Sequence, residues 1–259
     1  MLFSNVGNHL MIKINNLTKT YGNNTVLENI NLVVKKGQVY SLLGKNGAGK
    51  TTLINLILNM LIPDEGSIEV MDKPNTQLST LDKKRLGIVG DDLALIEEFT
   101  GYEYLMFVGK IYKIPTDVLK KRLTDLFQYF FENEDDIRKP MAKYSTGMKK
   151  KIAFCSAILN TPDLLILDEP FSGLDPLVAN QMVQFLKKYQ SSERAIFISS
   201  HDLSYVEKVS THIGVLNETK LVYNAPIQDF TENGKNELDD ALLKIIKPNT
   251  SELDKMDWI

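Results

Sequence analysis

A glycine-rich segment constrains the fold of this chain more than any other part of its sequence. Residues 44–51 read Gly-Lys-Asn-Gly-Ala-Gly-Lys-Thr, which matches the pattern of a glycine, any four residues and Gly-Lys-Ser/Thr. The apolar run 39–43 precedes this segment. An amphipathic helix is expected after it, ended by Pro63 and Gly66, with an apolar face of Leu53, Leu56, Ile57 and Met60. This order of strand, loop and helix predicts an α/β domain that binds a nucleoside triphosphate.

The chemistry of phosphate binding accounts for the residue types in this loop. The glycines allow the backbone to wrap a phosphate with successive N–H groups pointing inward, and the helix start favours the anion. Lys50 supplies a mobile charge for the β- and γ-phosphates, and Thr51 offers a hydroxyl to Mg²⁺. A chance match is the alternative, but the flanking strand and helix argue against it. The residues expected to bind nucleotide here are Gly44, Lys45, Asn46, Gly47, Ala48, Gly49, Lys50, Thr51 and Thr52.

A second apolar run ends in two acidic residues. Residues 164–167 are all apolar, and Asp168 and Glu169 follow them. Charges at the end of a buried strand are costly unless a site uses them. A solvated acidic turn would look the same by itself, but the phosphate-binding loop favours a functional role. Asp168 is then expected to hold Mg²⁺ opposite Thr51, and Glu169 to polarise the water that attacks the γ-phosphate.

The composition is that of a globular protein and excludes several classes of function. The chain has 259 residues, of which 43% are hydrophobic, and a net charge of −3. Neither a disordered chain nor non-specific nucleic-acid binding is therefore expected. The longest apolar run, residues 53–62, is too short for a membrane span, and residues 1–10 lack the Lys or Arg of a secretory signal. The single cysteine, Cys155, fits a reducing intracellular compartment and a small buried side chain.

The apolar pattern divides the chain into regions. Strands are expected at residues 12–14, 32–34, 39–43, 68–71, 164–167, 195–199, 213–216 and 221–223. Residues 101–160 show helical patterns instead, at 104–112, 116–131 and 146–159, and are interpreted as a helical insertion. We expect residues 11–231 to form the main domain, 232–259 a C-terminal helix and tail, and 1–10 an N-terminal extension.

Three further features carry weaker signals. Ser145 stands where a helix is expected to begin, so it can be an N-cap, and the N–H groups at the same helix start can bind an anion. His201 follows the buried run 195–199, although a lone histidine is more often structural than catalytic. The run of lysines at 149–151 is interpreted as a solvated helix face rather than a patch for lipid head groups.

These segments together resemble one family, the ATP-binding cassette (ABC) ATPases, over roughly residues 11–225. Residues 44–51 resemble its Walker A loop, residues 164–169 its Walker B strand with the catalytic glutamate, and His201 its switch histidine. The motifs stand in the order that the family shows.

Three other motifs of the family have counterparts in this chain. Tyr21 resembles the aromatic residue that stacks on adenine. Residues 172–175, which end in Asp175, resemble the D-loop. The family's signature motif is usually Ser-Gly-Gly-Gln, and its counterpart here is Ser145, Thr146, Gly147 and Met148.

The resemblance implies a P-loop NTPase core with a mostly parallel sheet, an N-terminal antiparallel β region and an inserted α-helical subdomain that carries the signature motif. It implies ATP and Mg²⁺ as cofactors and Lys50, Glu169 and His201 as catalytic residues. Two such subunits, expected to be a homodimer, face each other head to tail. Each ATP then lies between the loop of one subunit and the signature helix of the other, where Ser145 and Gly147 contact its γ-phosphate.

One residue departs from the family's pattern. The family has Gln or Glu after a strand such as residues 86–89, and here Asp91 stands in that place. A carboxylate at this position can still contact Mg²⁺ or the water. It is shorter than the usual side chain, and its charge adds to those of Asp168 and Glu169. We therefore expect slower or differently coupled hydrolysis.

The resemblance implies the ATPase subunit of a bacterial exporter for drugs, antimicrobial peptides or lipids. Such a subunit is cytoplasmic and attached to the inner face of the membrane through a separate integral membrane permease. One alternative is a soluble cassette protein that acts on ribosomes or DNA. The single set of motifs and the negative charge argue against it, so no nucleic-acid partner is expected. A second alternative, a weakly hydrolysing regulatory subunit, is disfavoured by the intact catalytic residues.

Overall fold

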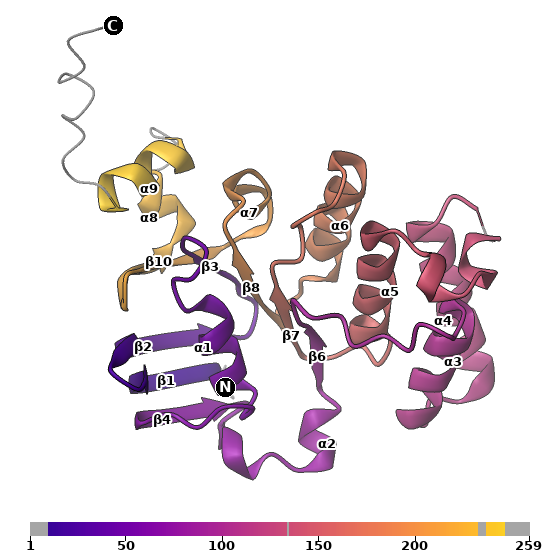
Figure 1. Ribbon diagram of the computed structural model, residues 1–259, viewed down its shortest axis with the longest axis horizontal. Helices are drawn as coiled ribbons and strands as arrows, with labels where there is room; N and C mark the ends of the chain where they lie inside the picture. The colour runs from indigo at the N-terminus through magenta and orange to yellow at the C-terminus, as the bar shows by residue number, and fades with distance from the viewer. Residues whose placement is uncertain (1–9, 134, 233–236, 247–259) are drawn as a thin grey trace, which may run out of the picture.

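The residues that the structure describes form two β-sheets with helices around them (Figure 1). The structure is a computed structural model and describes residues 10–133, 135–232 and 237–246. Most of the predicted N-terminal extension and the tail 247–259 lie outside the described residues. The combination of sheets and helices confirms the predicted α/β class.

The first sheet is antiparallel and contains the N-terminal strands. β1 (Leu10–Tyr21) lies between β2 (Asn24–Lys35) and β4 (Glu65–Val70), and the short β5 (Lys73–Pro74) pairs with β4. Buried and exposed residues alternate along the second half of β2, as expected for a strand with one covered face. The predicted antiparallel β region is therefore confirmed.

The second sheet carries the buried apolar runs. Its strands are β3 (Val39–Leu43), β6 (Leu86–Val89), β7 (Leu164–Asp168), β8 (Ala195–Ser200), β9 (His212–Asn217) and β10 (Lys220–Pro226). They lie in the order β10-β9-β3-β8-β7-β6, and only β10 runs antiparallel to its neighbour. Every residue of β3, β7 and β8 is buried, because both faces of this part of the sheet are covered. The predicted mostly parallel sheet is confirmed.

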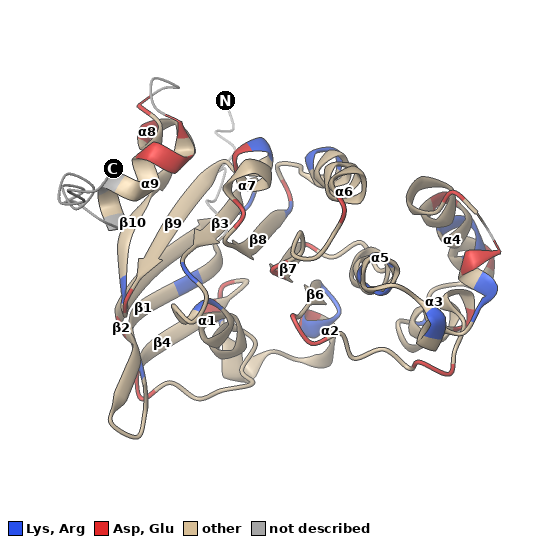
Figure 2. Cartoon of the chain, turned by 45° about the horizontal axis from the view of Figure 1, so that its top comes forward, with Lys and Arg blue, Asp and Glu red and all other residues tan. Residues whose placement is uncertain are grey.

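Helices cover the second sheet and extend to one side of it (Figure 2). They are α1 (Lys50–Ile57), α2 (Thr80–Lys83), α3 (Gly101–Ile111), α4 (Thr116–Phe130), α5 (Thr146–Ile158), α6 (Pro176–Tyr189), α7 (Leu203–Val209), α8 (Ile227–Phe230) and α9 (Leu238–Ile246). Helices α3, α4 and α5 fall in the predicted helical stretch, and the boundaries of that insertion stay a prediction. No helix of the described residues has both the length and the apolar composition of a membrane span.

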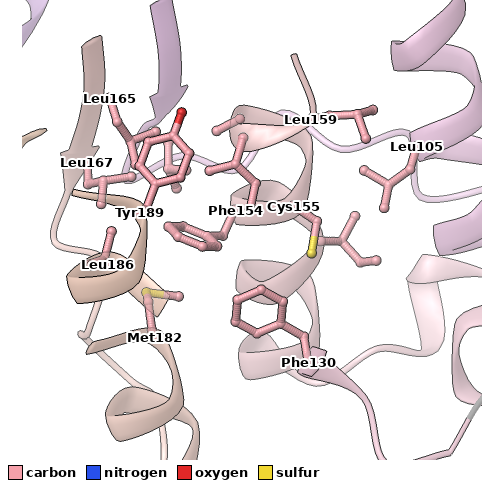
Figure 3. Close-up of a cluster of buried hydrophobic side chains, with 14 of the residues drawn as sticks. Leu105, Phe130, Phe154, Cys155, Leu159, Leu165, Leu167, Met182, Leu186 and Tyr189 are labelled. Carbon is pink, nitrogen blue, oxygen red and sulfur yellow. The ribbon is translucent and has the colours of Figure 1, made fainter. Parts of the chain in front are cut away.

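Two of the apolar cores lie on opposite faces of the second sheet. Helix α1 fills the space between the sheets, where Leu53 and Leu56 pack in one cluster with residues of β1, β2 and β3. The opposite face of β7 packs against α5 and α6, with Phe154 and Cys155 in the centre of that cluster (Figure 3). Cys155 is fully buried, as predicted, and burial raises the pKa of its thiol. The first core fixes the helix that begins at the glycine-rich loop.

The helix after the glycine-rich loop is shorter than expected. It ends at Ile57, and Asn59 adopts a left-handed backbone with φ of 56°. That conformation stops the helix before Pro63 is reached, and Met60 is 71% exposed instead of lying on the apolar face. Gly66 lies within β4, so the expected roles of Met60, Pro63 and Gly66 were wrong.

The close contact between β6 and α5 gives a test of the packing. A Cβ atom added to Gly87 would lie 2.4 Å from the carbonyl oxygen of Ala157. Because that oxygen belongs to a helix backbone, we expect Gly87→Ala to destabilise the protein by about 2 kcal/mol or more. Urea unfolding of the variant and the wild type measures the difference.

Gly90→Ala is the matched control, since a Cβ there would have the carbonyl oxygen of Asp92 at 3.6 Å as its nearest contact. We expect this variant to unfold near the wild-type midpoint. Equal midpoints for Gly87→Ala and Gly90→Ala would contradict the packing described here.

Candidate active site

The candidate site lies where three parallel strands end side by side. Leu43 of β3 is paired with Ser200 of β8, and Ser199 of β8 is paired with Asp168 of β7. The segments that follow these strands therefore leave the sheet at one edge. They are the glycine-rich loop, Glu169 with the residues after it, and His201.

The glycine-rich loop leaves the start of α1 open to an anion. Gly47 and Gly49 have φ of 80° and 100°, a region in which glycine is favoured. Gly49 is the N-cap of α1, no side chain caps the helix, and its first turn contains no acidic residue. The N–H groups of the first turn and the helix dipole are thus available to a phosphate.

Lys50 is folded back against the loop. Its Nζ donates hydrogen bonds to the carbonyl oxygens of Gly44 at 2.8 Å and Lys45 at 3.2 Å. The same Nζ lies 3.1 Å from Oε1 of Glu169, and the lysine side chain is 6% exposed. The ammonium group of Lys50 therefore lies between the glycine-rich loop and Glu169, which follows β7.

Glu169 lies between Lys50 and His201. Its Oε2 is 2.9 Å from Nδ1 of His201 and accepts a longer hydrogen bond, of 3.4 Å, from the backbone N–H of the same residue. Its Oε1 is buried and has the ion pair with Lys50 but no hydrogen bond of acceptable geometry. A buried carboxylate oxygen with spare acceptor capacity is unusual and fits a site that binds water or a ligand.

A serine that the sequence analysis did not single out holds the end of the acidic strand. Ser199 donates its hydroxyl to Oδ1 of Asp168, which is 2% exposed. The backbone N–H of Glu169 donates to both the carbonyl and the hydroxyl oxygen of Ser199, each at 3.1 Å. The sequence signal for this role is that β8, otherwise apolar, ends in two serines, Ser199 and Ser200.

Six of the nine predicted residues of the loop segment share one cavity with Asp91, Glu169 and His201. A cavity of about 490 Å³ is lined by Asn46, Gly47, Gly49, Lys50, Thr51, Thr52, Asp91, Glu169 and His201, together with Val26 and Ser172. A neighbouring cavity of about 480 Å³ has Thr51, Asp91 and Asp168 in its lining. Gly44 and Lys45 line a third, smaller cavity with His201, and Ala48 packs against the core. Asp91 therefore lies where the sequence places it, beside the loop.

The other predicted residues do not line the cavity of the glycine-rich loop. Ser145 is the N-cap of α5 and accepts a hydrogen bond from the N–H of Met148, which confirms its predicted capping role. Asp175 caps α6 by accepting a hydrogen bond from the N–H of Val178. Tyr21 is 47% exposed at the end of β1.

The signature residues and the D-loop are nevertheless neighbours. A Cβ at Gly147 would be in ordinary contact, at 3.7 Å, with Leu174 of the D-loop segment. Ser145 and Thr146 are exposed, and Gly147 and Met148 are partly buried. The start of α5 is therefore accessible from outside the chain.

Lys150 has a role that the sequence analysis missed. It is 8% exposed, so the interpretation of residues 149–151 as a solvated face is wrong for this residue. Its Nζ donates to the carbonyl oxygens of Glu169 at 3.0 Å and Ser172 at 2.6 Å. Burial lowers the pKa of Lys150, and the charges of Asp91, Glu169 and Asp168 oppose that shift.

One edge of the parallel sheet thus carries the open N–H groups at the start of α1, the side chain of Lys50, and the acidic residues Asp168 and Glu169. This arrangement places the protein among the P-loop nucleotide hydrolases.

Comparisons with known proteins narrow this class to one family. The family model for the ABC transporter matches residues 27–172, more than half of the chain. The bacitracin transport ATP-binding protein BcrA of Enterococcus faecalis is 36% identical over 227 residues, covering 87% of this chain and 72% of that protein. The lantibiotic transport ATP-binding protein SrtF of Streptococcus pyogenes is 32% identical over 212 residues, covering 82% and 89%.

A solved structure of an ATP-binding subunit of an ABC transporter agrees with these matches. It is 26% identical, has a TM-score of 0.82, and the likeness covers 92% of this chain and 100% of that one. The chain therefore belongs to the ABC transporter family and is an ABC ATPase, as its motifs predict.

Asp91 gives the first test of the site. We expect Asp91→Gln to raise the kcat of ATP hydrolysis by roughly threefold or more, because the substitution removes a negative charge next to the phosphates and lengthens the side chain. Steady-state phosphate release measures the rate. Asp125→Gln is the control, since Asp125 is exposed on α4 and lines neither of the two cavities, and its rate should stay near the wild-type rate. An unchanged rate in Asp91→Gln, with unchanged transport coupling, would contradict this role.

Proposed function

We propose that the protein binds Mg-ATP at the loop 44–51 and hydrolyses it to drive export through a separate membrane permease. The observation that carries the proposal is the position of Glu169, whose carboxylate lies between Lys50 and His201 in the wall of the cavity of the loop. A carboxylate there can accept a proton from a water molecule beside the terminal phosphate. Glu169 is accordingly the general base of this proposal, and His201 and Lys50 are its catalytic partners.

The residues around the loop fit both a triphosphate and Mg²⁺. The uncapped start of α1 offers N–H groups to phosphate oxygens. Thr51, Asp168 and Asp91 offer the oxygen ligands that Mg²⁺ prefers, and one or two carboxylates suffice when phosphates complete the shell. Larger groups of acidic, His or Cys side chains that could hold a metal are absent from the described part of the chain. When bound, Mg²⁺ neutralises charge that develops on the β- and γ-phosphates.

Lys50 and Glu169 are expected to change partners when the site is filled. Lys50 Nζ lies 3.1 Å from Glu169 Oε1, and a phosphate oxygen competes for the same ammonium group. Lys50 can turn toward the phosphate while the carbonyl oxygens of Gly44 and Lys45 still hold it. Oε1 of Glu169 is then free to accept a hydrogen bond from water, while Oε2 stays with His201.

A second copy of the chain completes the site in this proposal. The accessible start of α5, with Ser145 as its N-cap and Thr146, Gly147 and Met148 in its first turn, is a second anion-binding helix end. It lies outside the cavity of its own loop, so its phosphate ligand is the ATP bound by the partner subunit. Asp175 at the start of α6 lies at the same interface, and Tyr21 stacks on the adenine.

The names of the relatives guide the proposal for the cargo. The relatives from Enterococcus faecalis and Streptococcus pyogenes are transport ATP-binding proteins for bacitracin and for a lantibiotic. On that basis we favour an antimicrobial peptide as the substrate, with drugs and lipids as other classes. The permease is a separate chain, and the ATPase is attached through it to the cytoplasmic face of the membrane.

Glu169→Gln tests the assignment of the general base. The amide keeps the shape of the side chain but accepts no proton, so we expect kcat to fall by roughly 10²–10⁴-fold while ATP still binds. We further expect the variant to form an ATP-bound dimer, which size-exclusion chromatography with Mg-ATP detects.

Glu193→Gln is the matched control, because Glu193 also pairs with a lysine, Lys36, but outside the site. It should hydrolyse ATP at the wild-type rate and elute as the wild type does under the same conditions. Turnover that persists unchanged in Glu169→Gln would show that another group acts as the base.

A further inference from the structure

The three lysines at the start of α5 make different contacts. Lys149 pairs with the exposed Glu97, and Lys151 donates to the carbonyl oxygen of Phe130 at 2.7 Å. Lys150 lies between them in sequence, but its contacts are with the backbone of Glu169 and Ser172. It is also the one lysine of this run that is buried. Burial of an ammonium group is costly, so its two carbonyl partners are a specific arrangement rather than a chance contact.

The backbone of Glu169 is in a conformation that needs support. Its φ is 46°, in the left-handed region that side chains other than glycine rarely adopt. Its N–H donates to Ser199, and its carbonyl oxygen accepts hydrogen bonds from the N–H of Ser172 at 3.3 Å and from Lys150. Strained residues persist only when their surroundings fix them, and the direction of the Glu169 side chain depends on this backbone.

We propose that Lys150 is a positioning residue for hydrolysis, which holds the turn from Glu169 to Ser172 so that the Glu169 carboxylate points between Lys50 and His201. The proposal rests on the proposed function, in which Glu169 is the general base. Lys150 does not itself line the cavity, but it donates to the backbone of Glu169 and Ser172, which do, so it acts through Glu169 and does not bind nucleotide itself. The same bonds connect this turn to α5, the helix whose start carries the signature residues.

Lys150→Met separates this role from a merely structural one. Methionine keeps an unbranched stem of similar length but has no N–H donor. We expect kcat for ATP to fall by roughly 10- to 100-fold, because a small displacement of a catalytic group has a large effect, while KM and the Kd for ATP stay within about twofold. We also expect faster amide exchange in residues 169–175 of the nucleotide-free protein.

Lys151→Met is the matched control, since it also removes a bond from α5 to a backbone carbonyl but one outside the site. It should leave kcat and the exchange of residues 169–175 unchanged. Equal kcat losses in the two variants, or an unchanged kcat in Lys150→Met, would overturn the proposal.

Lys150→Gln tests the hydrogen bond itself and guards against a misfolded methionine variant. Its amide donates N–H bonds from a side chain one bond shorter, so it should recover part of the kcat that methionine loses. A glutamine variant no faster than the methionine variant would contradict positioning by hydrogen bonding. If Glu169→Gln retains turnover, the proposed function fails; if only Lys150→Met retains it, this inference alone fails.

Discussion

The parallel alignment of β3, β8 and β7 is the constraint on which the rest of the site depends. Because strand pairing aligns Leu43 with Ser200 and Ser199 with Asp168, the glycine-rich loop, His201 and Glu169 follow their strands at one edge. Side chains on both faces of these strands are buried in apolar cores, which hold the strands in place relative to one another. The chemistry of the site follows from that edge.

The acidic side chains at this edge of the sheet are stabilised by nearby hydrogen-bond donors and lysines. Lys50 pairs with Glu169, and Ser199 donates a hydrogen bond to Asp168. Lys150 donates to backbone carbonyl oxygens, and the nearby acidic groups oppose the lowering of its pKa by burial. The backbone N–H groups at the start of α1 add positive potential to that of the loop's lysine side chains. The site can therefore receive the large negative charge of a triphosphate without rebuilding its framework.

Much of this arrangement could be predicted from the sequence because the signals are local. The loop 44–51 and the acidic end of β7 are continuous motifs flanked by apolar runs, and the structure places both at one edge as expected. The roles of Ser199 and Lys150 could not be predicted in this way, because each depends on contacts with residues about 20 to 30 positions distant. The sequence does not distinguish the three lysines at 149–151, and only the packing of α5 shows that Lys150 is buried.

The same limit applies to the end of α1, where a left-handed Asn59 stops the helix earlier than the apolar spacing predicts. Apolar periodicity reports which residues suit a helix face, but it does not report the backbone conformation of a single residue.

Equilibrium binding of ATP with Mg²⁺ to the wild type and to Lys50→Met tests whether the loop 44–51 is the phosphate site. We expect the wild type to bind ATP and the variant, folded as judged by its unfolding midpoint, to bind it at least about tenfold more weakly, since a buried charge-assisted contact to phosphate is lost. Equal affinities in the two proteins would contradict the assignment of the loop 44–51 as the phosphate site.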